Sequence, residues 1–552
     1  MTESSAPFPV VDIPATAVEL PATATAVEAA EMEASAADPA GVGPAPAGAA
    51  GAARVGVGTV DYAGGIGVTP GNLKSRAVIG AVWTTGGFAV QQVMRLATNL
   101  VLTRLLSPGM FGLMSLVNVF IQGLQQFSDV GIGPSIIQSK RGDDPAFLNT
   151  AWTIQVVRGF ALGAMSATIA WPVAKLYDER MLVWLLPAAG LGAVIAGFNS
   201  TALFTLNRHL EVGKLTVRSV VGQLVGAAVM IGWALLHRSV WALLAGNLAA
   251  AVAALIFSNT LLPGVRNYFH WDRTAAREMT RFGRWIFVST VLTFLALEAD
   301  RFIFGKLVTM AELGVYGVAT MLAALPTTAV QRLGGTVIFP ALSRAHADGK
   351  NFQRVFDRVR MPLLAGSGLV SAGLLAGGNH LIEFLYDKRY YAGGWMLQLS
   401  AVSGWVQVLH VMSGSALLAM GSPRSVAAGN VVKLVTLVVC IPLGYHWTRD
   451  WGVYSLLGPV WGIILSDVLK QIVLAFSVRR RGLHMGLRNT LLTVLVLASA
   501  AAAWPAGNAV RAHVAKPAAG KLLAMAVVAA VCGIIWAPVL YRSLKDRKAT
   551  AA

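Results

Sequence analysis

Repeated apolar runs of about 20 to 25 residues, separated by short polar connections, constrain the fold of this 552-residue chain most strongly. A helix needs about 20 apolar residues to cross a bilayer, and inside the bilayer its backbone polar groups must be paired. The runs therefore predict an all-α polytopic membrane protein with about fourteen transmembrane helices. The expected spans are 78–101, 109–128, 150–172, 181–204, 215–236, 239–262, 285–305, 313–335, 361–382, 395–419, 425–446, 452–476, 489–510 and 521–541.

The composition supports a membrane protein and excludes other classes. Hydrophobic residues make up 55% of the chain and charged residues 13%, against about 25% charged in soluble domains. The net charge of +18 comes from bases between the apolar runs, not from one dense basic face, so nucleic acid is not an expected partner. Two cysteines in apolar runs and nine scattered histidines predict neither a disulfide nor a metal site.

The basic residues also predict an orientation. With the N-terminal tail in the cytoplasm, the cytoplasmic connections hold 27 Lys and Arg residues and the opposite connections hold 11. Arg218, Arg360 and Lys433 are counted in the cytoplasmic set. The positive-inside rule then places both termini in the cytoplasm.

An internal duplication divides the chain. Arg104-Leu-Leu-Ser-Pro-Gly-Met-Phe-Gly112 matches Lys306-Leu-Val-Thr-Met-Ala-Glu-Leu-Gly314 in character, 202 positions later, and the register continues with Gly133 over Gly335. Duplicated membrane chains often form two half-molecules around a central cavity, as in transporters. We expect two pseudo-symmetric lobes of six helices and two additional C-terminal helices.

Five segments follow from this division. Residues 1–73 form an acidic, Ala/Pro-rich tail, expected to be disordered and cytoplasmic. Residues 74–262 form the N-lobe with spans one to six, and 263–284 form an amphipathic linker at the membrane interface. Residues 285–480 form the C-lobe with spans seven to twelve. Residues 481–552 carry the last two spans and a basic cytoplasmic terminus.

Ionisable residues inside the predicted spans are the candidate site residues, because charge within a bilayer is costly and usually faces the bundle interior. Lys470 lies near a cytoplasmic span end and one turn from Asp467, so snorkelling or a local ion pair is expected. Arg332 also lies near a cytoplasmic end, and Arg158 lies about two turns into the third span. For both, a structural role and a substrate contact stay open.

Arg95 and the cluster Glu298, Asp300 and Arg301 are the central candidates. Position 95 maps onto 297 under the 202-residue offset, so both lobes carry ionisable groups at equivalent depths. Arginines there offer bidentate bonds to a pyrophosphate, and the carboxylates offer a site for a coupling proton or Na⁺. A local ion pair of Arg301 with Glu298 or Asp300 is the alternative. No catalytic residue and no resident cofactor are expected.

The duplicated motifs carry a family resemblance. Arg104 to Leu113, with Phe127-Ser-Asp-Val-Gly-Ile-Gly133 and Ile136-Ile-Gln138, resembles the first hairpin of bacterial polysaccharide flippases. Those are the colanic-acid and succinoglycan exporter branch of the multidrug/oligosaccharidyl-lipid/polysaccharide superfamily. The second half is similar to that family's pattern in Ala299-Asp-Arg-Phe-Ile-Phe-Gly305, Leu313-Gly-Val-Tyr316 and Phe339-Pro-Ala-Leu-Ser-Arg344.

The resemblance implies that an undecaprenyl-pyrophosphate-linked oligosaccharide crosses the inner membrane by alternating access, for exopolysaccharide, capsule or O-antigen synthesis. A polysaccharide polymerase and a chain-length regulator are the implied partners. Two alternatives share the superfamily: a lipid II flippase and a drug or cation antiporter. A membrane-embedded polymerase or ligase is disfavoured, because such enzymes typically need a large outer loop and every predicted outer loop here is short. The chain is therefore expected to be no enzyme.

Overall fold

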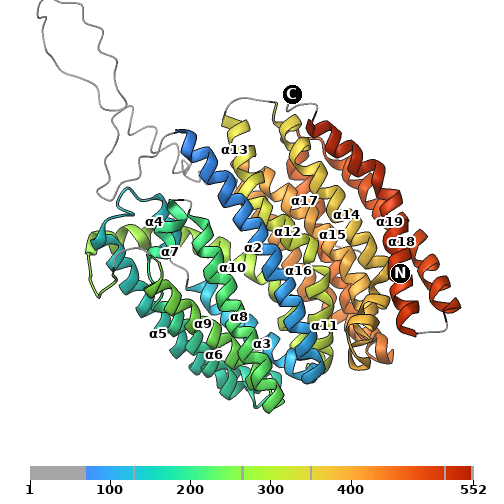
Figure 1. The fold of residues 1–552 in the computed structure, drawn as a ribbon, viewed down its shortest axis with the longest axis horizontal. Helices are drawn as coiled ribbons and strands as arrows, with labels where there is room; N and C mark the ends of the chain where they lie inside the picture. The colour runs from blue at the N-terminus through green and yellow to red at the C-terminus, as the bar shows by residue number, and fades with distance from the viewer. Residues whose placement is uncertain are drawn as a thin grey trace, which may run out of the picture. The chain divides into compact units, whose positions relative to one another are not determined.

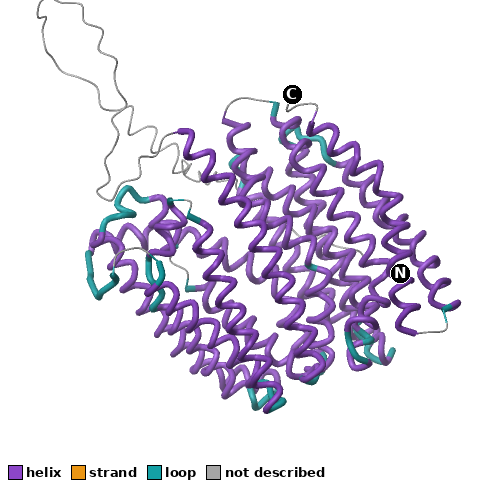
Figure 2. Tube along the Cα trace, in the orientation of Figure 1, coloured by secondary structure: helices purple, strands orange, loops and turns teal. Residues whose placement is uncertain are grey.

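The computed structural model describes residues 70–128, 131–209, 211–262, 266–347, 351–514 and 517–548. The chain divides into two units, Met1–Val68 and Thr69–Ala552, and the described residues all belong to the second. Residues 1–69 of the predicted tail lie outside the described part, so the expected disorder stays a prediction. Within the described residues the secondary structure is helical, with turns and loops and no strand (Figure 2).

The helices follow one another along the chain with short connections (Figure 1). Their bounds are α2 (Pro70–Leu105), α3 (Pro108–Phe127), α4 (Ile132–Gln138), α5 (Pro145–Tyr177), α6 (Leu182–Gly197), α7 (Ala202–Arg208), α8 (Val212–Leu236), α9 (Trp241–Thr260), α10 (Arg273–Leu307), α11 (Met310–Ala323), α12 (Leu325–Leu333), α13 (Phe339–Ala347), α14 (Phe352–Leu385), α15 (Gly393–Ala419), α16 (Pro423–Thr448), α17 (Leu457–Arg479), α18 (Gly486–His513) and α19 (Pro517–Lys548).

The all-α membrane fold is confirmed. In the described part of the chain, nine helices are long and apolar enough to cross a membrane, or eleven if each bent pair, α6 with α7 and α11 with α12, forms one span. Every predicted run overlaps one of the helices or bent pairs. Helices α2, α3 and α10 are not among the nine, so the count of fourteen stays a prediction.

The two halves repeat one packing scheme. We call α2–α9 (Pro70–Thr260) the N-half and α10–α17 (Arg273–Arg479) the C-half. In the N-half α2 packs on α8, α3 on α6, α5 on α6, α6 on α9 and α8 on α9. The equivalent C-half pairs are α10 with α16, α11 with α15, α14 with α15, α15 with α17 and α16 with α17. These five matched pairs show the pseudo-symmetry expected from the duplication. Helices α18 and α19 pack on each other and on α14 at one edge (Figure 1).

The matching motifs begin equivalent helices with local signals. In the first copy Pro108 occupies the first turn of α3 after Ser107, where its missing N–H removes no helical bond. In the second copy Thr309 caps α11 in a capping box, in which its hydroxyl accepts from the Glu312 N–H and the Glu312 carboxylate accepts from the Thr309 N–H. Both copies therefore start a helix at the same register.

Helices α3 and α11 join the halves by crossing at the matched glycines. A Cβ on Gly112 would lie 1.9 Å from the Met310 carbonyl oxygen, and one on Gly314 would lie 1.9 Å from the Pro108 carbonyl oxygen. Met310 is the 202-residue equivalent of Pro108, so the contact is two-fold symmetric. Only glycine allows this approach of two backbones.

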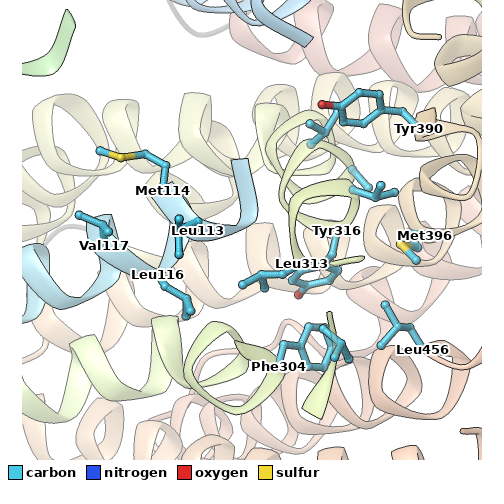
Figure 3. Close-up of a cluster of buried hydrophobic side chains, with 14 of the residues drawn as sticks. Leu113, Met114, Leu116, Val117, Phe304, Leu313, Tyr316, Tyr390, Met396 and Leu456 are labelled. Carbon is cyan, nitrogen blue, oxygen red and sulfur yellow. The ribbon is translucent and has the colours of Figure 1, made fainter. Parts of the chain in front are cut away.

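Buried apolar side chains surround the crossing (Figure 3). Leu113 and Leu116 of α3, Phe304 of α10 and Leu313 and Tyr316 of α11 belong to one cluster and are at most 8% exposed. Phe304 and Tyr316 pack edge to face with ring centroids 4.6 Å apart. The hydrophobic core thus fixes the two halves against each other at this end of both helices.

The predicted linker follows a hydrogen-bonded course along α5. The Tyr268 N–H donates to Asn149 Oδ1 at 3.2 Å, and the Asp272 N–H donates to Thr150 Oγ1 at 3.0 Å. Helix α10 begins at Arg273, twelve residues before the predicted span, because Asp272 provides an N-cap that accepts from the Thr274 N–H. Asp272 also pairs with Arg141 at 2.9 Å, which ties the start of the C-half to the N-half.

Candidate functional site

A cavity of about 830 Å³ lies between α2, α3, α8 and α9 of the N-half and α10 and α11 of the C-half. Its volume is within the range of sites for sizeable ligands. Hydroxyl and amide side chains of α2, α3, α8 and α9 line it together with apolar residues. The polar members are Thr98, Asn99, Ser115, Asn118, Ser219, Gln223 and Asn247.

Three arginines line this cavity, which we call the larger cavity. They are Arg95 from α2, Arg218 from α8 and Arg301 from α10. The described lining residues include no carboxylate. Arg95 is exposed to the cavity and has no hydrogen-bond or ion-pair partner within the described chain. Arg218 donates to the Ala254 carbonyl at 3.2 Å and to Asn199 Oδ1 at 3.3 Å, which leaves further donors of its guanidinium available.

A second cavity of about 330 Å³ lies in the C-half, and Arg301 lines both cavities. Here the walls carry Glu298, Asp300, Tyr316 and Lys433. Arg301 forms an ion pair with Glu298 one turn before it. The Tyr316 hydroxyl donates to Asp300 Oδ2 at 2.7 Å. Arg301 therefore stands between an electropositive cavity and one whose walls carry charges of both signs.

A buried polar cluster around Asp467 of α17 adjoins the second cavity. The Lys433 ammonium, from α16, lies 2.7 Å from Asp467 Oδ1, and both side chains are at most 5% exposed. Ser403 and Gln407 of α15 donate to Asp467 Oδ2. His410 contacts the Asp467 carbonyl oxygen through Nε2 at 2.8 Å. Burial of a carboxylate requires such a partner set, because an unpaired buried charge is strongly destabilising.

The predicted candidates separate into two groups. Arg95 and Arg301 line the larger cavity, and Glu298 and Asp300 line the second one. Arg158 lines neither: its guanidinium donates to Ser128 Oγ at 2.9 Å and to the Gln125 carbonyl at 2.6 Å, at the C-terminal end of α3. Arg332 is exposed on α12 and lines neither cavity.

Three of the bases assigned to cytoplasmic connections instead line a cavity or are buried inside the helix bundle. Arg218 lies on α8 and lines the larger cavity, and Lys433 lies ten residues into α16 in its buried ion pair. Arg360 is fully buried in α14. The expected pairing or snorkelling of Lys470 is also wrong, since Asp467 pairs with Lys433 and Lys470 is only 9% exposed.

The sequence contained a signal for the missed pair. Lys433 lies in the middle of one apolar run and Asp467 in the middle of the next, and charges of opposite sign at such depths indicate mutual pairing. Counting Lys433 as a connection base obscured that signal. Removing these three residues from the cytoplasmic set leaves its excess of positive charge intact.

Comparison with known proteins gives a consistent picture. The model of a family described as "Polysaccharide biosynthesis protein" matches residues 101–392, more than half of the chain. The chain is 21% identical to the lipopolysaccharide biosynthesis protein WzxC of Escherichia coli, over 77% of this chain and 85% of that one. It is 23% identical to the succinoglycan biosynthesis transport protein ExoT of Rhizobium meliloti, over 48% and 52%. A putative O-antigen transporter of Shigella flexneri is 24% identical, over 41% and 56%.

Two solved structures share the fold. The lipid II flippase MurJ in an inward closed conformation superposes with a TM-score of 0.63, covering 84% of this chain and 99% of that one at 12% identity. A multidrug resistance transporter of the MATE family in an inward-facing conformation gives a TM-score of 0.54, covering 73% and 95% at 14% identity. Both comparisons show that this chain shares the fold of these transporters.

Proposed function

The chain belongs to the polysaccharide biosynthesis protein family, and we propose that it translocates lipid-linked oligosaccharide repeat units across the inner membrane. The ligand is an oligosaccharide on an undecaprenyl-pyrophosphate carrier, moved from the cytoplasmic to the periplasmic leaflet. A polymerase and a chain-length regulator would use the product for exopolysaccharide, capsule or O-antigen synthesis. The names of the relatives, which are transport and biosynthesis proteins, support this assignment.

The observation that carries the proposal is the convergence of Arg95, Arg218 and Arg301 on a cavity without carboxylates among its described lining residues. Guanidinium groups bind phosphate oxygens in bidentate fashion, and three of them balance much of the charge of a pyrophosphate. The hydroxyl and amide side chains beside them suit sugar hydroxyl groups. A cationic drug would meet electrostatic repulsion there, which disfavours a drug or cation antiporter.

The crossing of α3 and α11 supports alternating access. Gly112 and Gly314 bring the halves into backbone contact next to the connections at Ser107 and Thr309. The excess of basic residues in the other set of connections supports a periplasmic position for these two. In that orientation the contact closes the periplasmic side, and translocation requires the two helices to separate there.

The energy source is proposed to act in the C-half. Glu298 and Asp300 line the second cavity and offer carboxylate oxygens to a coupling proton or Na⁺. Arg301 lines both cavities. Binding of a proton or Na⁺ to these carboxylates therefore alters the position or charge balance of Arg301 at the ligand site. No resident cofactor is needed for transport of this kind.

Polysaccharide export in cells tests the ligand site. We expect Arg95→Ala, Arg218→Ala and Arg301→Ala each to abolish export, while the amount of membrane-inserted protein stays at the wild-type level. Arg180→Ala, which removes an exposed arginine that lines neither cavity, is the matched control and should export normally. Normal export by all three cavity variants would refute the pyrophosphate assignment.

Purified protein in vesicles separates the alternatives. Vesicles loaded with an undecaprenyl-pyrophosphate oligosaccharide, with lipid II or with a cationic dye should show translocation of the first. Preferential movement of lipid II or of the dye would replace the proposal with the corresponding alternative.

A further inference from the structure

The charged groups around the second cavity form a balanced set that reaches from the ligand site to the buried Asp467. Three carboxylates take part: Glu298 and Asp300 of α10 and Asp467 of α17. Three cations face them from α10, α16 and α17. These are Arg301, Lys433 and Lys470. The other ionisable groups that face the set are Tyr316 of α11 and His410 of α15.

Lys433 occupies the middle position of this set. Its ammonium pairs with Asp467 at 2.7 Å, and its side chain also lines the cavity that contains Glu298 and Asp300. A lysine ammonium is a compact charge on a flexible four-carbon stem, so one lysine can serve carboxylates on either side of it.

Lys470 is a second cation next to the same carboxylate. It follows Asp467 by three residues in α17, which places both on one face of the helix. Lys470 is 9% exposed and has no hydrogen-bond or ion-pair partner within the described chain. A buried ammonium without a partner is costly, so Lys470 would gain free energy from a vacated position at Asp467.

Arg301 connects this set to the larger cavity. An anion bound by Arg95, Arg218 and Arg301 competes with Glu298 for the Arg301 guanidinium, since one guanidinium cannot serve both fully. Withdrawal of Arg301 leaves Glu298 without its ion pair in a partly buried site, where its side chain is 15% exposed. A replacement cation is then required.

We propose that Lys433 is that cation: when an anionic ligand draws Arg301 away, the Lys433 ammonium moves from Asp467 to Glu298 and Lys470 takes its place at Asp467. This relay rests on the proposed function, because it needs a phosphate-bearing ligand in the larger cavity. No bond is made or broken, and no external proton or metal ion is taken up. The state of the ligand site is thereby transmitted to α16 and α17.

Binding of inorganic pyrophosphate to the purified protein tests the relay. Calorimetric titration in buffers of different ionisation enthalpy gives the number of protons taken up per pyrophosphate bound, and choline chloride as the salt removes Na⁺ and K⁺. We expect Lys433→Gln to take up about one proton more than wild type, because Glu298 must then be protonated. Lys214→Gln, an exposed lysine paired with Glu211, is the matched control and should equal wild type.

A second variant keeps the test decisive if Lys433→Gln does not fold. Glu298→Gln removes the competitor for Arg301, so pyrophosphate should bind several-fold more tightly than to wild type. Equal proton uptake by Lys433→Gln and wild type, or unchanged affinity in Glu298→Gln, would overturn the relay while leaving the phosphate site intact. Failure of wild type to bind pyrophosphate would overturn both the phosphate site and the relay.

Discussion

Replacement of Gly112 or Gly314 by alanine should weaken the contact between the two halves. Each added Cβ would lie 1.9 Å from a carbonyl oxygen, whereas ordinary van der Waals contact begins near 3.4 Å, so α3 and α11 must separate by about 1.5 Å. Overpacking of this kind costs about 1–3 kcal/mol in free energy of unfolding. We therefore expect both variants to lower the melting temperature of the purified protein, by similar amounts because the contact is symmetric.

The double variant provides the sharper measurement. One separation of the helices relieves both clashes, so the second alanine should add much less destabilisation than the first. Gly317→Ala is the matched control: it lies one turn along α11 and its Cβ would meet no atom within 4 Å. Alanine there should be neutral or stabilising by up to about 1 kcal/mol, from helix propensity. Single variants as stable as Gly317→Ala, or strictly additive losses, would refute the account of the crossing.

Three further predictions concern charged groups. Asp467→Asn should lower the free energy of unfolding by about 3–5 kcal/mol, measured by thermal unfolding, because it leaves the Lys433 ammonium buried without a carboxylate; a smaller loss than in an exposed-site control would contradict the pairing. Hydrogen bonds from Thr274, and next from Arg141, hold the pKa of the Asp272 carboxyl well below its ordinary value. The ionised carboxylate therefore stabilises the folded protein above about pH 4, and this stabilisation is lost as the pH falls toward the shifted pKa. The protection of the amides of 266–272, measured as the hydrogen-exchange rate relative to the intrinsic rate at each pH, should fall in acid, and Asp272→Asn should remove that dependence. Arg158→Ala should destabilise the end of α3 by about 1–3 kcal/mol and leave pyrophosphate affinity unchanged, as measured by calorimetry; lost affinity in a stable protein would make Arg158 a ligand residue.

The fold was accessible from the sequence because its determinants are local or repeat at a fixed offset. Apolar runs specify membrane helices directly, and the matched motifs at Arg104 and Lys306 specify equivalent helices in the two halves. The close contact of Gly112 with Gly314 is a different matter. The register aligns these residues in sequence, but only the packing of α3 against α11 shows that they touch.

The site was only partly accessible, because depth along a span does not specify the direction in which a side chain points. Arg95 and Arg301 were found by their positions in spans, and both line the larger cavity. Arg158 satisfies the same criterion yet binds the end of a neighbouring helix. Arg218 and Lys433 were missed because charge counting assigned them to connections, where a base needs no partner.

Translocation by the purified protein tests the central claim most directly. Vesicles would carry a fluorescent undecaprenyl-pyrophosphate oligosaccharide in one leaflet, and its accessibility to an external quencher would be followed in time. Wild-type protein should move the lipid between leaflets, inorganic pyrophosphate should inhibit this movement, and Arg95→Ala should abolish it. Movement by Arg95→Ala, Arg218→Ala and Arg301→Ala at the wild-type rate would contradict the claim that the three-arginine cavity holds the carrier.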